Sequence, residues 1–331
     1  MTEPRGPSGR RPATHLHSLL MYSEDEQFLA TAVPFARAGL SAGEPVFIAT
    51  GPYNTRLLRR HLGPRADAVT FAPADWYTTP ARTLLAYHDQ AHREPGPSRV
   101  VGEAPWDGRS EDEAREWIRY EALLTLALAS SGARHLCPYD TRALPGAILR
   151  AAQLTHPSLT GAGAGADAVM AAVRPNPAHM DPAEFSAACD AAPLPEPPPK
   201  RDEFHFDGPQ QFARLREFTA QYARAAGLAA ARLDSLLVCV DEAASNAVRH
   251  GGSGGMCRIW VAAGELVCEV TDPQGTLDTA LAGYLPPSTG LLNGRGLWIV
   301  RQLSDAADMR TTPGGTVIRI RMRLAGSTAR G

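Results

Sequence analysis

A proline-rich segment near residue 195 sets the strongest limit on how this chain can fold. The segment DAAPLPEPPPK, residues 190–200, contains five prolines, and such a run favours an extended, semi-rigid spacer. The 331 residues therefore divide into two parts, each long enough to bury its own core. We predict a disordered tail over 1–13, a first domain over 14–185, a linker over 186–202, a second domain over 203–325 and a tail over 326–331.

The composition argues against several classes of protein. Hydrophobic residues make up 44% and charged residues 21% of the chain, as in soluble globular proteins. A net charge of −2 provides no field to attract nucleic acid. The longest apolar run is far shorter than the about 20 residues that span a bilayer, and the five scattered cysteines include no C-x-x-C pair. We therefore expect a cytoplasmic protein that binds neither nucleic acid nor membrane.

The two halves differ in their order of predicted elements. In the first half, β-rich runs alternate with helical patterns, which indicates an α/β domain with a mostly parallel sheet. The predicted strands are Pro45–Ala49, Ala68–Phe71, Arg99–Val101 and His135–Cys137, and the helices include Glu24–Ala38 and Ser110–Ser130. The second half reads as α+β, a mixed sheet with helices on one side. Its predicted elements are helices Gln210–Ala226, Ala230–His250 and Leu297–Leu303, a hairpin Cys257–Asp272 turning at Ala263-Gly264, and a strand Val317–Leu324.

One helix of the second half carries a polar column opposite its apolar face. On a helical wheel its apolar residues fall within about 80° of one direction. They are Leu233, Leu236, Leu237, Ala243, Ala244, Ala247 and Val248. Glu242, Asn246 and His250 follow the spacing i, i+4, i+8 and point the other way. Taken alone, such a column is more often a solvated face than a ligand site.

Three further motifs follow this helix in a fixed order. Asp272 ends a strand and is followed by Pro273-Gln274-Gly275, where a carboxylate can accept a hydrogen bond from an exocyclic amine. Gly294-Arg295-Gly296-Leu297 opens a helix whose free N–H groups suit phosphate oxygens. Thr316 begins the last strand. Each motif is weak by itself, but the ordered set predicts a nucleotide pocket.

The segments EAASNAVRH, VTDPQG, GRGLWIV and GTVIRIRM resemble the four nucleotide-binding boxes of the GHKL ATPase superfamily, over about residues 203–325. The compact anti-sigma-factor serine-kinase group is the nearest match. The resemblance implies that ATP and Mg²⁺ are cofactors, that Asn246 ligates Mg²⁺, and that Glu242 orients or deprotonates the attacking hydroxyl.

The same resemblance assigns the remaining site residues. Asp272 would read adenine and Thr316 would lie near it, Gly294 and Gly296 would cradle phosphates with Leu297 following, and His250 would form pocket wall. A lid would extend over roughly Thr276–Asn293. The family has glycine two residues after the aspartate, where this chain has Gln274, and glycine arrives only at Gly275. Nucleotide binding is therefore expected more firmly than catalysis.

The first half contains no G-x-x-x-x-G-K-[ST] motif, so no P-loop is expected there. Its segments HLHSLLMYSEDEQFLATAVPFARAGLSAGEPVFIAT, CPYDTRALPGAIL and THPSL resemble the MEDS sensory domain, over about residues 14–180. The resemblance implies a RecA-like α/β core that senses a small ligand whose identity stays open. His15, His17, Cys137 and His156 are soft or borderline metal donors, but their spacing matches no known metal pattern, and core packing is favoured for them.

Together these features predict an ATP-dependent regulator of the anti-sigma-factor type, a protein-serine kinase under the control of a sensory domain. The expected partners are an anti-anti-sigma-like protein and, as a second candidate, a sigma factor; a homodimer is left open. One alternative is a non-catalytic module in which ATP only sets partner affinity. Another is a relative of the histidine kinases, although neither His179 nor His205 lies in a long amphipathic helix.

Overall fold

The computed structural model describes residues 15–93, 96–161, 172–251, 254–276, 282–284 and 295–324. The chain forms two compact units. The first comprises Met1–Thr78, Ala86–Asp107 and Glu116–Pro182, and the second comprises Thr79–Leu85, Gly108–Arg115 and Ala183–Gly331. Each unit has a sheet and an apolar core of its own, and each is described separately below.

The first unit is built on a seven-stranded sheet in the order β3-β2-β4-β5-β1-β6-β7. Strands β1 to β6 pair in parallel, and only β7 is antiparallel to its neighbour. The strands are β1 (Leu16–Tyr22), β2 (Val46–Ala49), β3 (Thr70–Phe71), β4 (Arg99–Gly102), β5 (Arg134–Asp140), β6 (Ser158–Thr160) and β7 (Val173–Pro175). The predicted α/β class, with a parallel sheet, is confirmed.

The two faces of this sheet carry different buried side chains, apolar on one face and partly polar on the other. Leu20, Ile48 and Leu136 pack with Phe28 and Leu58, from the first two helices, in one apolar cluster. The helices before residue 182 are α1 (Asp25–Ser41), α2 (Pro52–Leu62), α3 (Pro80–Arg93), α4 (Glu111–Ala127) and α5 (Gly146–Thr155). The first residues of α3 and α4 are assigned to the second unit, as is α7 (Pro182–Cys189) from Ala183 onward. On the opposite face, His17 of β1 and His135 of β5 lie among aromatic and polar side chains.

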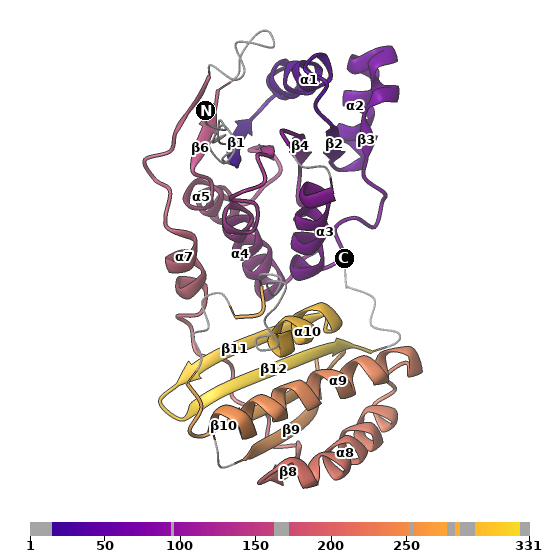
Figure 1. The fold of residues 1–331 in the computed structure, drawn as a ribbon, viewed down its shortest axis with the longest axis vertical. Helices are drawn as coiled ribbons and strands as arrows, with labels where there is room; N and C mark the ends of the chain where they lie inside the picture. Colours follow the sequence, from indigo (N-terminus) through magenta and orange to yellow (C-terminus); the bar gives the residue numbers. More distant parts are fainter. Residues whose placement is uncertain are drawn as a thin grey trace, which may run out of the picture. The chain divides into compact units, whose positions relative to one another are not determined.

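The second unit is a five-stranded sheet in the order β11-β12-β10-β9-β8, with helices on one side (Figure 1). Its strands are β8 (Asp202–Phe206), β9 (Gly255–Ala262), β10 (Glu265–Asp272), β11 (Ala306–Thr312) and β12 (Gly315–Arg323). Its helices are α8 (Phe212–Ala225), α9 (Ala230–Asn246) and α10 (Arg295–Leu303). The α+β class is confirmed, although the neighbouring pairs of described strands are antiparallel where a mixed sheet was expected.

The helical wheel of α9 correctly identified its core face. Leu233, Leu236, Ala243 and Ala244 are buried in the main cluster, and Leu237 packs against it. The hairpin is also confirmed: Ala263 and Gly264, both with positive φ, form the turn between β9 and β10, as expected of a tight two-residue connection.

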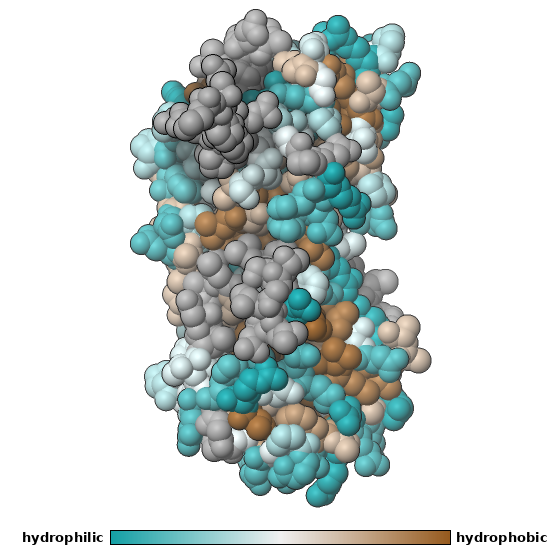
Figure 2. Space-filling view, viewed as in Figure 1, coloured by the Kyte–Doolittle hydropathy of each residue, from teal (hydrophilic) through white to brown (hydrophobic). Residues whose placement is uncertain are grey.

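Hydrophilic residues make up much of the visible surface of both units (Figure 2). Among described residues, the large hydrophobic side chains that are exposed are Tyr53, Val238 and Val261. In the described part of the chain, no helix has the length and apolar character needed to cross a bilayer.

Candidate nucleotide site

Two of the predicted site residues on α9 face the start of α10. These helices pack against each other, and Gly296 lies in the first turn of α10. A Cβ placed on Gly296 would approach Glu242 Oε2 closer than 3.0 Å and would lie 3.5 Å from Asn246 Nδ2. The lack of a side chain at Gly296 therefore makes room for the acid and the amide predicted to act on the phosphates. Leu297, the next residue, packs against the apolar core.

The third member of the polar column, His250, lies beyond the end of the α-helix. The α-helix ends at Asn246 and continues as a π-helical turn over Ala247–Gly251. His250 is exposed in this turn. The structure thus brings Glu242 and Asn246 together at α10, whereas the place of His250 in the pocket wall stays a prediction.

A second polar group lies where β10 ends. Asp272 pairs with Thr316 across the β10–β12 ladder, and both are buried. A Cβ on Gly275 would lie closer than 3.0 Å to Asp272 Oδ2 and 2.9 Å from Thr316 Oγ1. Gln274 N donates a hydrogen bond of 3.0 Å to Asp272 Oδ1. Asp272, Gly275 and Thr316 therefore lie close together at the end of β10.

Two buried polar atoms at these positions have no hydrogen-bond partner. They are Asn246 Nδ2 and Thr316 Oγ1. Buried polar atoms in folded proteins are normally satisfied, so an unpaired one marks a place where a ligand or water is expected. The donor set, an amide, a carboxylate and a hydroxyl beside glycines, fits a nucleotide with Mg²⁺, which prefers oxygen ligands. Gly294 and most of the predicted lid over Thr276–Asn293 lie outside the described residues.

In the first unit, the segment after β1 is unsuited to phosphate. Asp25 and Glu26 occupy the first turn of α1, where a phosphate-binding loop would present free N–H groups. Asp25 is paired with Arg142 at 2.8 Å. Carboxylates at this helix start repel a phosphate, in agreement with the missing P-loop motif.

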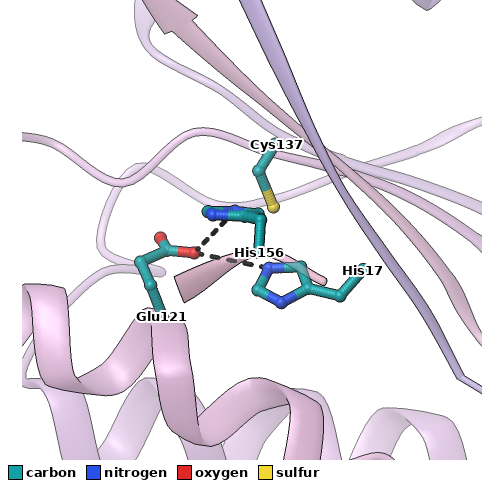
Figure 3. Close-up of side chains that lie close together, drawn as sticks. All are labelled: His17, Glu121, Cys137 and His156. Carbon is teal, nitrogen blue, oxygen red and sulfur yellow. Dashed lines mark ion pairs between the residues drawn. The ribbon is translucent and has the colours of Figure 1, made fainter. Parts of the chain in front are cut away.

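Sequence reasoning missed one residue with a distinctive setting, Glu121 of α4. It lies near His17, Cys137 and His156, three of the four donors for which core packing was favoured (Figure 3). The fourth, His15, instead shares a hydrogen bond of 3.0 Å between its Nε2 and His135 Nδ1. The signal available in the sequence was a lone carboxylate within the apolar helical stretch YEALLTLA.

Two family models match the chain. The first, described as MEthanogen/methylotroph, DcmR Sensory domain (MEDS), matches residues 16–157. The second, described as Histidine kinase-like ATPase domain, matches residues 207–322. The chain therefore carries a MEDS sensory domain followed by a histidine kinase-like ATPase domain, and both resemblances are confirmed. The second family implies ATP as a ligand, usually with Mg²⁺.

One similar solved structure is the crystal structure of the RsbU and RsbW domains of Rv1364c from Mycobacterium tuberculosis. The identity is 19%, the TM-score is 0.30, and the match covers 38% of this chain and 33% of that chain. This chain thus matches about a third of that protein's length. No curated protein matches this chain.

Proposed function

We propose that this MEDS–ATPase chain is a partner-switching regulator whose C-terminal domain binds Mg·ATP and phosphorylates a serine of an anti-anti-sigma-like protein. A small ligand of the MEDS domain controls this activity, and a sigma factor is the second candidate partner. The observation that carries the proposal is the convergence of Glu242 and Asn246 on Gly296 at the start of α10. Only a glycine leaves this space open.

In this proposal the residues at the end of β10 bind adenine, and those of α9 act at the phosphates. Asp272 accepts a hydrogen bond from the exocyclic amine of adenine, with Thr316 beside it, and its buried position favours a specific contact. The Asn246 amide oxygen ligates Mg²⁺. When bound, Mg·ATP supplies the phosphoryl group that is transferred.

Glu242 handles the proton of the incoming hydroxyl. It precedes Asn246 by four residues on α9, so both side chains reach the same side of the helix. A carboxylate there can accept the proton of a seryl hydroxyl as the hydroxyl oxygen attacks phosphorus. The proton moves to Glu242 Oε, while the leaving oxygen remains on the nucleoside diphosphate. Glu242 therefore affects transfer more than binding.

The test separates these two steps. Full-length protein is incubated with γ-labelled ATP, Mg²⁺ and a purified anti-anti-sigma domain, and phosphoserine on that domain is measured. Glu242→Gln keeps the shape of the side chain but cannot take the proton. We expect ATP binding to persist and transfer to fall by about 100-fold or more. Equal transfer by wild type and Glu242→Gln would contradict the kinase proposal.

A specific observation supports a second candidate, an ATP-gated binding module without catalysis. Gln274 stands where the family has glycine, and its N–H engages Asp272 Oδ1, so the start of the lid differs from the family pattern. In that case Glu242→Gln leaves control of the partner unchanged while ATP remains bound. A histidine-kinase relative would instead yield an acid-labile phosphohistidine, which acid treatment of the labelled products distinguishes from phosphoserine.

A further inference from the structure

One face of the first unit's sheet carries buried polar side chains at its centre. Strands β1 and β5 are parallel neighbours, and the register pairs His17 with His135 and Leu19 with Cys137. Because side chains alternate along a strand, His17 and Cys137 point to the same face. On the other face, Leu20 and Leu136 belong to an apolar cluster. The buried polar side chains thus lie together on one face of the sheet.

Four donors from four different segments meet on this face. His17 comes from β1, Glu121 from α4, Cys137 from β5 and His156 from the residue after α5 (Figure 3). One ligand atom from each lies within 4.8 Å of those of the others. The side chains of His17 and His156 are 0% exposed and that of Glu121 is 4% exposed. No part of this cluster depends on the second unit.

The donors are unpaired where they face one another. His17 Nε2 and His156 Nε2 each lie 3.6 Å from Glu121 Oε2, which is too long for a hydrogen bond. None of these three buried atoms has a hydrogen-bond partner. Buried imidazole nitrogens and carboxylate oxygens are expected to be satisfied, so these three atoms point to a ligand that all of them contact.

The outer sides of the same rings are held by the protein. His156 Nδ1 lies 2.8 Å from the carbonyl oxygen of Ala152, and His17 Nδ1 lies 3.1 Å from Thr125 Oγ1. Since a carbonyl only accepts, the proton of His156 sits on Nδ1 and the Nε2 lone pair points to the centre. A hydrogen bond with Tyr139 also holds Glu121. Such outer partners typically orient metal ligands.

We propose that His17, Glu121, Cys137 and His156 bind one Zn²⁺ ion inside the MEDS domain. Two nitrogens, one carboxylate oxygen and one thiolate are the donors that zinc takes, usually four in a tetrahedron. The edge of such a tetrahedron is about 3.4 Å for nitrogen and oxygen ligands, close to the 3.6 Å separations found here. Magnesium and calcium, which select oxygen ligands, do not fit this set.

The site is closed, which indicates a structural role. Four protein donors fill the coordination of zinc and leave no position for a substrate. The ion would tie β1, α4, β5 and the end of α5 together around the centre of the sheet. Binding displaces the thiol proton of Cys137 to solvent.

The first test uses the full-length wild-type protein without any substitution. After purification without chelators, we expect about one zinc ion per chain by elemental analysis. Cobalt exchanged into the protein should give the visible bands of a tetrahedral ion and a thiolate-to-cobalt charge-transfer band. Sub-stoichiometric zinc together with cobalt spectra that lack the charge-transfer band would overturn the proposal.

Substitutions then locate the ion. Cys137→Ser should abolish the charge-transfer band, and Glu121→Gln, which keeps the shape of the side chain, should lower zinc affinity by at least about tenfold. Thr125→Val leaves all four donors in place and should weaken binding by about tenfold through His17. A band that survives Cys137→Ser would overturn the assignment. Circular dichroism checks that each variant is folded. If a variant does not fold, the zinc content and cobalt spectrum of the wild-type protein still test the proposal.

Matched controls exclude a surface site. His88 and His92 lie one helical turn apart with ring centroids 4.0 Å from each other, a pair that can capture an ion adventitiously. His92→Gln should leave the zinc content and the cobalt spectrum unchanged, and so should Cys189→Ser. Loss of the ion in His92→Gln, with retention in Glu121→Gln, would move the site to the surface and contradict the proposal.

Discussion

The close approach of the chain to Asp272 and Thr316 at the end of β10 depends on the missing side chain of Gly275. A methyl group there would press on Asp272 Oδ2 and Thr316 Oγ1, which belong to the residue proposed to read adenine and to the residue beside it. We predict that Gly275→Ala weakens ATP binding by about 10- to 100-fold, the loss expected for a hydrogen bond to a charged group. Titration calorimetry measures this change.

A matched glycine provides the control for Gly275. A Cβ on Gly314 would meet only Thr312 Oγ1, at the ordinary distance of 3.7 Å. Gly314→Ala should therefore keep the wild-type affinity for ATP. Equal affinities for ATP in the two variants would contradict the assignment of adenine to Asp272 and Thr316.

We make the opposite prediction for His250, which is exposed and lies in the π-helical turn beyond the end of α9. We expect His250→Ala to change the Kd for ATP by no more than about twofold. Asn246→Ala, tested beside it, should lose most of the affinity. A loss of affinity in His250→Ala as large as in Asn246→Ala would show that the column continues to the nucleotide.

At the residue scale, the sequence predicts which side chains lie together when they belong to one helix or strand. The spacing of Glu242 and Asn246 places both on one face of α9, as expected. Glu121 was missed because its neighbours His17, Cys137 and His156 come from other segments, and no local spacing relates them. The π-turn at His250 was missed because its sequence contains no proline or glycine before Gly251.

At the scale of elements, the second face of the five-stranded sheet is held by charge. Arg319 donates from Nε (2.9 Å) and Nη2 (2.6 Å) to Glu269 Oε2, and Arg258 Nη1 lies 3.1 Å from Glu269 Oε1. Glu269 and Arg319 are buried. Removing one partner of a buried pair leaves an uncompensated charge and costs about 3 kcal/mol or more.

We therefore predict that Glu269→Gln lowers the unfolding temperature of the ATPase domain by about 6–12 °C. Glu203→Gln is the control, because Glu203 is also paired with Arg258 across the sheet but at the surface, where ion pairs contribute little. Thermal unfolding followed by circular dichroism compares the two. Similar midpoints for both variants would contradict a stabilising role for Glu269.

Polar residues within a strand decided which strands could be predicted from the sequence. The hairpin β9–β10 was predictable because largely apolar runs lie on both sides of the turn at Ala263-Gly264. Strand β11, AADMRTT, was not predicted because Asp308 and Arg310 are charged yet buried in ion pairs, so its alternation does not read as apolar. Strand β1 was not predicted either, since the histidine at position 17 and Ser18 interrupt its apolar pattern.

At the scale of the whole molecule, two separate apolar clusters predict two separate unfolding transitions. One cluster belongs to the first unit and the other to the second. Mg·ATP at 100 times its Kd should stabilise the second unit by about 2.7 kcal/mol and raise only its transition, by about 5–10 °C. Scanning calorimetry with and without Mg·ATP measures this. A shift of both transitions by the same amount would contradict independent cores.

The irregular segment between the two halves was the most accessible large-scale feature in the sequence, because the five prolines of residues 190–200 disfavour a helix or a central strand. The structure has no helix or strand between Cys189 and Asp202. The prolines do not tell how the segment contacts the sheet, where Arg319 Nη2 donates to the Pro195 carbonyl at 2.8 Å. Such a contact depends on tertiary folding alone.

The central claim is that the C-terminal domain binds Mg·ATP through the residues of α9 and β10. Titration of the full-length protein with ATP and Mg²⁺ by calorimetry tests it most directly, with Asn246→Ala and Asp272→Ala measured beside wild type. We predict binding of one ATP per chain with a micromolar Kd, lost in both variants. Wild type that fails to bind ATP, or variants that bind as tightly as wild type, would contradict the account.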